Sequence, residues 1–221
     1  MIGVLVSSKT FQGLPESPRY PALETVAGLF PDHPLALNIV HYHTWEREAL
    51  QEQLVQITEK GGPNLHGIQL NVTWPPPAVL RGYRAAFPGK RIVLSVGSSA
   101  LAKIGDSPEA LSQKLADEYG ELADYILFDP SGGRGKPFDT DRARAFLAAI
   151  ERSGLGAGLV VAGGLSGATL DLVRPLLKDF PDLSFDAEGK LRDSTDRLIP
   201  ELAAEYVRKA FALFESEGPH R

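Results

Sequence analysis

The stretch that decides the fold, residues 124–139, reads DYILFDPSGGRGKPFD. Its residues Tyr125 to Phe128 form a short apolar run of strand formers, and Asp129 follows that run directly. A glycine-rich turn with Arg134 and Lys136 comes next, before a helical pattern. In parallel α/β proteins the carboxyl ends of the strands form the ligand site. The sequence therefore makes Asp129 the first candidate for chemistry.

Length and composition indicate an ordinary globular chain. The 221 residues are 43% hydrophobic and 23% charged, which predicts one domain over residues 1–221. No apolar run approaches the roughly 20 residues that a membrane span needs, so we expect no membrane contact. The formal charge of −5 gives no basic footprint for nucleic acid.

The chain contains no cysteine, which excludes disulfides, thiolate metal sites and a cysteine nucleophile or base. The start, MIGVLVSSKT, lacks a basic leader followed by a long apolar stretch, so we expect no signal peptide and a cytoplasmic location.

Apolar runs with strand character alternate with amphipathic helical patterns along the whole chain. Such alternation requires crossover connections and hence a parallel sheet, and the runs are apolar on consecutive residues, as in strands covered on both faces. The predicted class is an α/β, TIM-barrel-like parallel (βα) barrel with seven recognisable units. Either an eighth strand hides in an irregular segment, or the barrel is incomplete and a helix, a loop or a second subunit covers its seam. The runs are Ile2–Val6, Leu35–Val40, Gly67–Val72, Arg91–Val96, Tyr125–Phe128, Gly158–Ala162 and Asp182–Phe185.

The helical patterns lie between these runs. Ser107 with Pro108, and Asp196 ahead of the last pattern, are expected to begin helices. In the last pattern an apolar row predicts core packing or cover for an open seam. The row is Leu202, Tyr206, Phe211 and Phe214, and the patterns span residues 21–30, 45–60, 75–87, 107–122, 140–154, 166–180 and 197–216.

Four stretches together resemble the phosphoribosylanthranilate isomerase family, which opens an aminoribose phosphate by an Amadori rearrangement in tryptophan biosynthesis. They are SPRY at residues 17–20, GIQLNV at 67–72, LFDPSGGRGKPFD at 127–139 and LVVAGGL at 159–165. Their order and spacing are similar to the family's across almost the whole chain. The resemblance implies an isomerase of a small phosphorylated substrate, without cofactor or metal.

The chain also departs from the family pattern. It starts where the family's second strand starts, so the first unit, with the cysteine thought to be the general base, is absent. The family's histidine corresponds to Asn71. Activity is therefore expected to be weak or altered, unless Asp186, Glu188 or His41 replaces the base. Two acids near the expected phosphate loop, Asp186 and Glu188, oppose a dianion.

The resemblance implies a role for individual residues. Asp129 matches the general acid, and the alternative is a carboxylate that caps the loop or pairs with Arg134 or Lys136. Arg19 matches an arginine that meets the anthranilate carboxylate, or it is an exposed loop residue. The residues expected around the substrate are Arg19, Gly133, Gly163, Gly164 and Asp186. The three glycines suit a phosphate loop, with Gly163 and Gly164 ahead of a helix expected from Ser166, and they equally suit simple turns.

Two other classes of function stay open. One is a non-catalytic descendant that binds a small ligand, with Trp45 or Trp74 stacking on it, or that forms a homodimer across an open seam. The other is a metal-dependent enzyme that uses His41 and His43, which alternate along one strand and so share a face.

Overall fold

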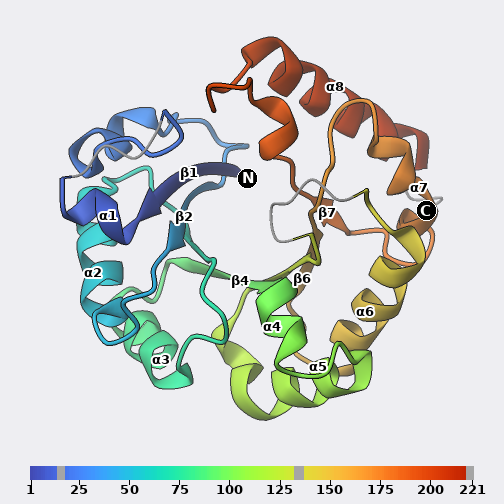
Figure 1. Ribbon diagram of the computed structural model, residues 1–221, viewed down its shortest axis with the longest axis horizontal. Helices are drawn as coiled ribbons and strands as arrows, with labels where there is room; N and C mark the ends of the chain where they lie inside the picture. The colour runs from blue at the N-terminus through green and yellow to red at the C-terminus, as the bar shows by residue number, and fades with distance from the viewer. Residues whose placement is uncertain (14–17, 132–136, 218–221) are drawn as a thin grey trace. The chain divides into compact units, whose positions relative to one another are not determined.

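The computed structural model describes residues 1–13, 18–131 and 137–217, and Figure 1 shows the course of the chain. Two compact units can be separated. Unit 1 comprises residues Met1–Ser95 and Glu118–Asp124, and unit 2 comprises Val96–Asp117 and Tyr125–Arg221. The single domain that we expect over residues 1–221 therefore stays a prediction.

Unit 1 is built from parallel strands that pair in chain order. Each strand lies next to its successor, with Val4 opposite Val40, Val40 opposite Ile68 and Ile68 opposite Ile92. These central positions are buried except for Val4, which is half-buried, so the consecutive apolar residues fill a covered sheet. The strands are β1 (Ile2–Ser7), β2 (Asn38–His43), β3 (Gly67–Leu70) and β4 (Arg91–Gly97), whose last two residues belong to unit 2.

Helices of unit 1 follow the strands. In α2, Leu50, Leu54 and Ile57 are completely buried at the spacing of one helix face, which explains why this pattern packs onto the sheet. The polar face of α2 turns to solvent. The helical segments are α1 (Ser8–Phe11), a 3-10 helix (Leu23–Leu29), α2 (Leu50–Lys60), α3 (Pro77–Ala86) and a 3-10 helix (Gly120–Leu122).

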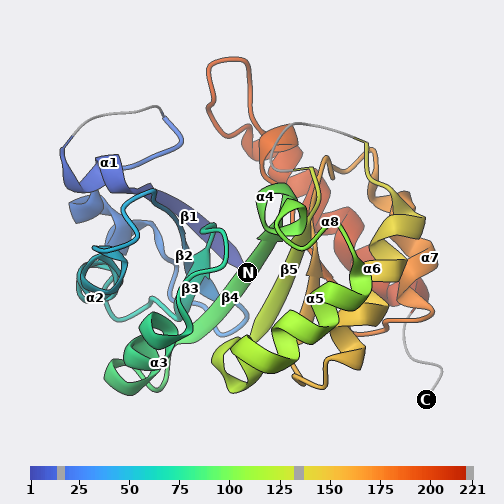
Figure 2. The same ribbon diagram turned by 60° about the horizontal axis from the view of Figure 1, so that its bottom comes forward.

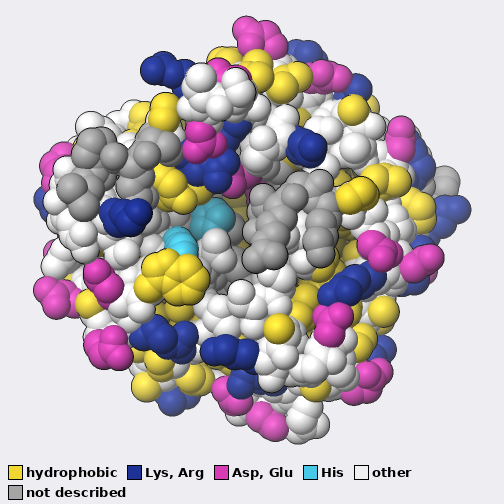
Figure 3. All heavy atoms as spheres, in the orientation of Figure 1, with side chains coloured by type: hydrophobic (Ala, Val, Ile, Leu, Met, Phe, Trp, Pro, Cys, Tyr) yellow, Lys and Arg dark blue, Asp and Glu magenta, His cyan; other side chains and the backbone are white. Residues whose placement is uncertain are grey.

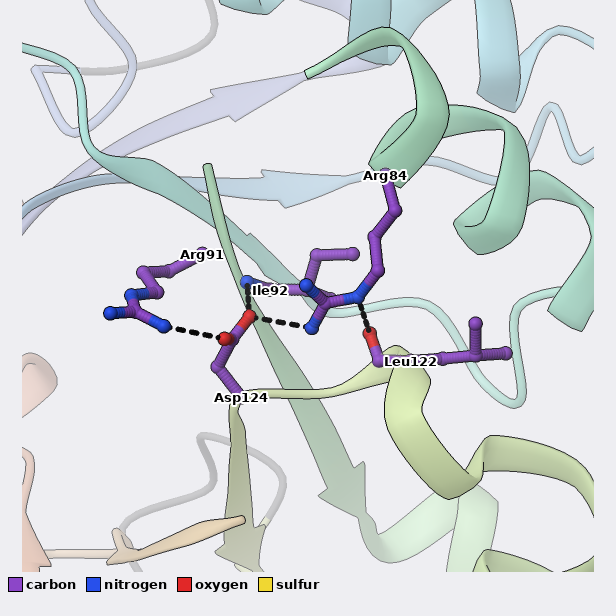
Figure 4. Close-up of polar contacts among 5 residues, drawn as sticks. All are labelled: Arg84, Arg91, Ile92, Leu122 and Asp124. Atoms are coloured by element: carbon purple, nitrogen blue, oxygen red, sulfur yellow. Dashed lines mark hydrogen bonds and ion pairs between the residues drawn. The ribbon is translucent and has the colours of Figure 1, made fainter. Parts of the chain in front are cut away.

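An ion-pair network secures the amino-terminal end of β4 (Figure 4). The carboxylate of Asp124 accepts hydrogen bonds from Arg84 at 2.8 Å, from Arg91 at 2.9 Å and from the backbone N–H of Ile92 at 2.8 Å. Arg84 also donates to the backbone oxygen of Leu122 at 3.3 Å. The network fastens α3 and the segment before β5 to β4, at the strand end opposite to the one where ligands bind in such folds.

Unit 2 repeats the βα pattern (Figure 2). Strand β5 pairs with β6 and β6 with β7, all parallel, and α6 packs against β5 and β6, with Phe146 stacked on Phe128 at 4.8 Å between ring centroids. The strands are β5 (Tyr125–Asp129), β6 (Gly158–Val161) and β7 (Ser184–Phe185). The helices are α4 (Ser98–Ala102), α5 (Pro108–Lys114), which continues as a π-helical segment (Leu115–Tyr119) into unit 1, α6 (Thr140–Arg152), α7 (Arg174–Leu177), α8 (Pro200–Glu217) and the 3-10 helices Leu170–Leu172 and Gly189–Leu191.

All seven predicted strands are present in the described residues, and the α/β, TIM-barrel-like class is confirmed. The second run is displaced: β2 begins at Asn38, and Leu35 is 83% exposed. The Asp182–Phe185 run contributes only the two residues of β7.

Several of the predicted helices differ from those in the structure. The pattern at 21–30 forms a 3-10 helix, and residues 166–180 form turns, a 3-10 segment and the four-residue α7. Pro175 at the start of α7 lacks the N–H that a longer helix through residues 166–180 would need. Ser107 caps α5 as expected, with its Oγ accepting the N–H of Ala110 at 3.2 Å. Asp196 does not begin α8, because it lies in a turn at φ 68° and the helix starts at Pro200.

The apolar row on α8 is only partly core. Tyr206 is buried, and Phe214 stacks on Phe185 at 4.9 Å between centroids, whereas Phe211 is 61% exposed. The expected core packing is therefore wrong for Phe211, whose ring turns outward, and it is incomplete for Leu202 and Phe214, which are each 37% exposed. A second subunit over this row stays a prediction.

None of the helices in the described parts of the chain combines the length and apolar character that crossing a bilayer requires.

Candidate active site

The carboxyl group of Asp129 is fixed at the end of β5 by a local turn. Its Oδ1 accepts hydrogen bonds from the backbone N–H of Ser131 at 3.0 Å and from the Ser131 hydroxyl at 2.6 Å. Aspartate followed two residues later by such a donor is the usual Asx turn. The expected alternative of a loop-capping carboxylate is thus part of its role. Ser131 is 6% exposed, so the turn is held inside the protein.

Gly163, just after β6, makes room for this carboxyl group. A Cβ at this position would lie 3.2 Å from Oδ1 of Asp129 and 3.3 Å from the Ser131 side chain. Its backbone φ of 116° is one that residues with a side chain rarely adopt. Glycine at position 163 of the AGGL pattern therefore has a steric cause, and its expected contact with a substrate stays a prediction.

The strand register brings Asp186 to the level of Asp129. Phe128 on β5 pairs with Val161 on β6, and Val161 pairs with Phe185 on β7. The next residues along the two outer strands are Asp129 and Asp186, and the ladder continues through the Asp186 N–H to the Val161 oxygen at 2.8 Å. Residues at one level of a parallel sheet point to the same face, and strands two apart are about 10 Å apart. Both acids therefore belong to one site.

The electrostatics of Asp186 agree with this arrangement. Burial raises the pKa of Asp186 to about 6, and the negative charges of Glu188 and Asp129 add to the rise. Like charges and a poorly solvated position both favour the protonated carboxyl. Asp186 therefore binds a proton more tightly than an ordinary aspartate, as a residue suited to general acid–base chemistry does.

Two side chains that sequence reasoning missed hold this end of β7. Arg192 donates from Nε to Oε1 of Glu188 at 3.0 Å, and the Tyr206 hydroxyl donates to the backbone oxygen of Phe185 at 3.0 Å. The only sequence signal for the first contact is the four-residue spacing of opposite charges, which is common on any surface. The hydroxyl contact joins α8 to β7 and has no sequence signal.

The helix expected from Ser166, after Gly163 and Gly164, is absent. Gly164 has a φ of 66°, but Ser166 does not begin a helix: its N–H bonds to the Thr169 hydroxyl at 2.9 Å. The helix start, with the dipole that it would direct at an anion, is therefore absent after Gly163 and Gly164, and their phosphate role stays a prediction. Gly133, Arg134 and Lys136 lie outside the described residues, so the expectations for this loop stay predictions.

Unit 1 gathers a separate set of the expected residues. His41 and His43 face the same side of β2, as their alternation predicts, and Arg19 lies close enough to act on His41. Burial lowers the pKa of His41 to about 4, with further lowering by the charges of His43 and Arg19. His41 is thus neutral at pH 7.

An exposed tryptophan adjoins these histidines. Trp45 is 84% exposed and its ring lies 4.7 Å from that of His43, edge to face. Histidine side chains are visible beside hydrophobic ones on the face in Figure 3. Trp74 has a different role, because it is 8% exposed and packs on Tyr119 at 5.6 Å, as a core residue.

The expected metal alternative finds no geometric support. Within the described ranges, no three histidine or acidic side chains come together as a metal site would require. One cavity of about 460 Å³ lies elsewhere, between α6 and α7, lined by Arg144, Arg174, Pro175, Lys178 and Asp179. Its arginines already pair with Asp179 and Asp171, so this cavity is a solvated ion-pair groove, distinct from the strand ends.

With the geometry established, comparison with known proteins gives a fold class. No protein-family model and no curated protein matches the chain. Its structural neighbours are TIM-barrel proteins, and the likeness confirms an α/β, TIM-barrel-like fold.

Particular neighbours come from Rhizobium etli. The carboxyl transferase domain of its pyruvate carboxylase with oxamate and biotin matches with a TM-score of 0.58 and 11% identity, covering 98% of this chain and 40% of that chain. Pyruvate carboxylase with acetyl coenzyme-A matches with a TM-score of 0.54 and 14% identity, covering 89% of this chain and 19% of that chain. This chain thus spans well under half the length of these neighbours, and identities this low show the fold alone.

Proposed function

We propose that the protein is an isomerase of the phosphoribosylanthranilate isomerase type, with Asp129 and Asp186 as its acid–base pair. The observation that carries the proposal is that two carboxyl groups lie on one face at the carboxyl ends of β5 and β7, and one of them has a pKa raised to about 6. The family resemblance of residues 127–139 and 159–165 supports the reaction class.

In the proposed reaction the two acids have opposite roles. Asp129 gives its proton to the ring oxygen of the aminosugar while the ring C–O bond breaks. Asp186 then takes the proton from the neighbouring sugar carbon, and the bond that held that proton becomes the C=C bond of the enolamine. The enolamine tautomerises to the aminoketone, and solvent carries a proton from Asp186 back to Asp129. Both carboxyl groups thus regain their starting states, and the product is an isomer of the substrate. With a pKa of about 6, Asp186 is about nine-tenths ionised at pH 7 and is a stronger base than an ordinary carboxylate. In this proposal Asp186 is therefore the general base.

The direct test follows the fluorescence of freshly made phosphoribosylanthranilate. The wild type should consume it faster than the buffer does, and Asp129→Asn and Asp186→Asn should each lower the rate about 100-fold or more. Asp182→Asn is the matched control, because Asp182 is an exposed aspartate of unit 2, and it should leave the rate unchanged. Wild-type protein that does no better than buffer contradicts the proposal.

The pH dependence tests the assignment of the two roles. If Asp186 is the base, activity falls as the pH drops through about 6, because the base becomes protonated. If Asp186 is the acid instead, activity falls as the pH rises through the same value. The direction of the change thus separates the two assignments.

A second candidate is a protein that binds an aromatic ligand without turnover. The exposed Trp45 ring against His43 favours it, because an accessible indole at a strand end suits stacking. Anthranilate should then quench tryptophan fluorescence in the wild type and in Trp74→Phe, but not in Trp45→Phe. Saturable quenching without turnover supports this candidate over the isomerase, and no quenching contradicts it.

A further inference from the structure

Arg192 is a mostly buried cation beside the candidate acid–base pair. Its side chain is 12% exposed, and its Nε donates to Oε1 of Glu188, whose own side chain is 31% exposed. A guanidinium so poorly exposed to solvent attracts a carboxylate more strongly than a surface cation does, because water screens the two charges less. The contact therefore fixes the direction of the Glu188 carboxylate.

The loop after β7 is built to hold this arginine. Nη1 of Arg192 donates to the backbone oxygen of Asp196 at 3.0 Å, and Arg192 forms an antiparallel bridge with Leu198. Asp193 accepts the N–H groups of Thr195 and Arg197 at 2.8 and 3.0 Å, which closes the turn between them. The guanidinium is thus anchored from both sides of a tight hairpin and has little freedom to leave Glu188.

Within unit 2, three groups face Asp186. They are Glu188 on the loop that carries Arg192, Asp129 at the end of β5 and Tyr206 on α8. Glu188 and Asp129 bear negative charge against Asp186, while the phenol of Tyr206 stays neutral because burial raises its pKa, helped by the charge of Asp186. The Arg192 side chain donates hydrogen bonds to Glu188 and to the backbone oxygen of Asp196, so its influence on Asp186 passes through Glu188.

We propose that Arg192 is a positioning residue of this site: it holds the Glu188 carboxylate next to Asp186. A catalytic effect of Arg192 rests on the proposed function, in which Asp186 is the base. The contact between Arg192 and Glu188 is independent of that proposal. Glu188 repels Asp186 and would turn toward solvent if nothing bound it. By preventing this, Arg192 keeps a negative neighbour against the candidate base and strengthens its hold on a proton.

The test is a carboxyl ¹³C NMR titration of the whole chain, with the Asp186 signal assigned by its loss in Asp186→Asn. In Glu188→Gln the titration midpoint of Asp186 should fall by about half a unit to one unit, because a like charge is gone. Arg192→Met keeps the length of the side chain and removes the guanidinium. It should shift the midpoint in the same direction, because Glu188 then loses the contact that directs its carboxylate.

A double-mutant cycle separates this indirect effect from a direct one. Arg192→Met combined with Glu188→Gln should titrate like Glu188→Gln alone. Arg192→Lys, which keeps a cation in place, should restore most of the wild-type midpoint. Arg192→Gln, which also removes the charge, replaces Arg192→Met as the test if that variant does not fold. An unchanged or raised midpoint in the arginine variant overturns the proposal, as does an unchanged midpoint in Glu188→Gln.

The titration needs no turnover, so it is independent of the enzyme assay. A shifted midpoint in an inactive protein supports the role of Arg192 and removes only the proposed isomerase. An active protein whose Asp186 ignores Arg192 keeps the isomerase and removes the positioning role. In an active protein, the acidic limb of the kcat profile should move with the NMR midpoint, which a purely structural arginine would not cause.

Discussion

Replacing Asp124 by asparagine should destabilise unit 1 by about 2–3 kcal/mol. The carboxylate is 12% exposed in the ion pair with Arg84 and serves three donors: Arg84, Arg91 and the N–H of Ile92. Asparagine retains one acceptor oxygen, enough for the Ile92 N–H, but loses the charge. A hydrogen bond to a charged partner contributes about 1.5–3 kcal/mol when that partner is poorly solvated.

The two arginines contribute unequally to this figure. Arg84 is 28% exposed and would be left without its counter-charge, so most of the loss comes from it. Arg91 is 57% exposed, and solvent screening reduces its pair to at most about 1 kcal/mol. With a urea m-value of about 2 kcal/mol per molar, the unfolding midpoint should fall by about 1–1.5 M.

The assay can read unit 1 by itself. Both tryptophans of the chain, Trp45 and Trp74, belong to this unit, and the emission of the buried Trp74 shifts to the red on unfolding, whereas Trp45 is already 84% exposed. Urea melts followed by tryptophan emission therefore report on the part of the chain that holds Asp124. Asp32→Asn, an exposed aspartate of the same unit, is the control and should stay within about 0.5 kcal/mol of wild type.

The pH dependence gives an independent check on Asp124. Burial alone would raise the pKa of Asp124, but the bond from the Ile92 N–H and the two arginines outweigh burial, and the folded pKa is lowered. A lowered folded pKa means stability that is present above the unfolded pKa of about 3.9 and is lost as the pH falls through the folded value. The difference between wild type and Asp124→Asn should therefore be constant from pH 5 to 7 and shrink below about pH 4. A variant as stable as the control at pH 7 would refute the reasoning.

Three further outcomes are expected. In thermal melts Gly163→Ala should lower stability by about 1–3 kcal/mol, because its Cβ would lie 3.2 Å from Oδ1 of Asp129 at a φ of 116° and would displace that side chain. Gly156 also has a positive φ, but open space surrounds it, so Gly156→Ala is the control and should cost only about 1 kcal/mol. The pKa of His41 is about 4 in the folded protein, whereas the unfolded chain binds this proton at about pH 6.5, so the protein should lose stability as the pH falls from about 6.5 to 4. In acid melts the wild type should lose more stability over that range than His41→Asn does. Equal losses would argue against a buried neutral imidazole. If a second copy covers the outer face of α8, light scattering should give a dimer that Phe211→Ser dissociates, and a monomeric wild type at micromolar concentration would exclude that cover.

Strands were predictable from this sequence because their signal is local. Runs such as Ile126 to Phe128 are apolar on consecutive residues and end at a polar residue or glycine, and any covered parallel strand must show that pattern. The helical structure between residues 166 and 180 could not be predicted, because the spacing of the leucines is the same whether the backbone forms one helix or several short turns. Pro175 and the Ser166–Thr169 turn decide that question, and a periodicity argument does not weigh them.

The residues of the candidate site also differ in whether they have a local sequence signal. Asp129 could be found because it follows a short apolar run directly and begins an Asx turn, both local features. Asp186 was placed near the site only through the family resemblance, because the strand before it has two residues. Arg192 could not be found, since its importance comes from its burial and from a hairpin that the sequence does not announce.

The absence of cysteine does not by itself leave such a site without a base. A carboxylate in water holds its proton too weakly to remove one from carbon, but proton affinity depends on surroundings as much as on chemical type. At the end of β7, burial and the negative charges of Glu188 and Asp129 act on Asp186 in the same direction and raise its pKa to about 6. Neighbouring carboxylates therefore do more than oppose a phosphate, because the same repulsion that weakens anion binding makes one of them a stronger base. If the proposed isomerase is active, Glu188→Gln should weaken the base and ease the repulsion of an anionic substrate at once, so that kcat and KM fall together, an outcome that simple loss of a phosphate-binding residue would not produce.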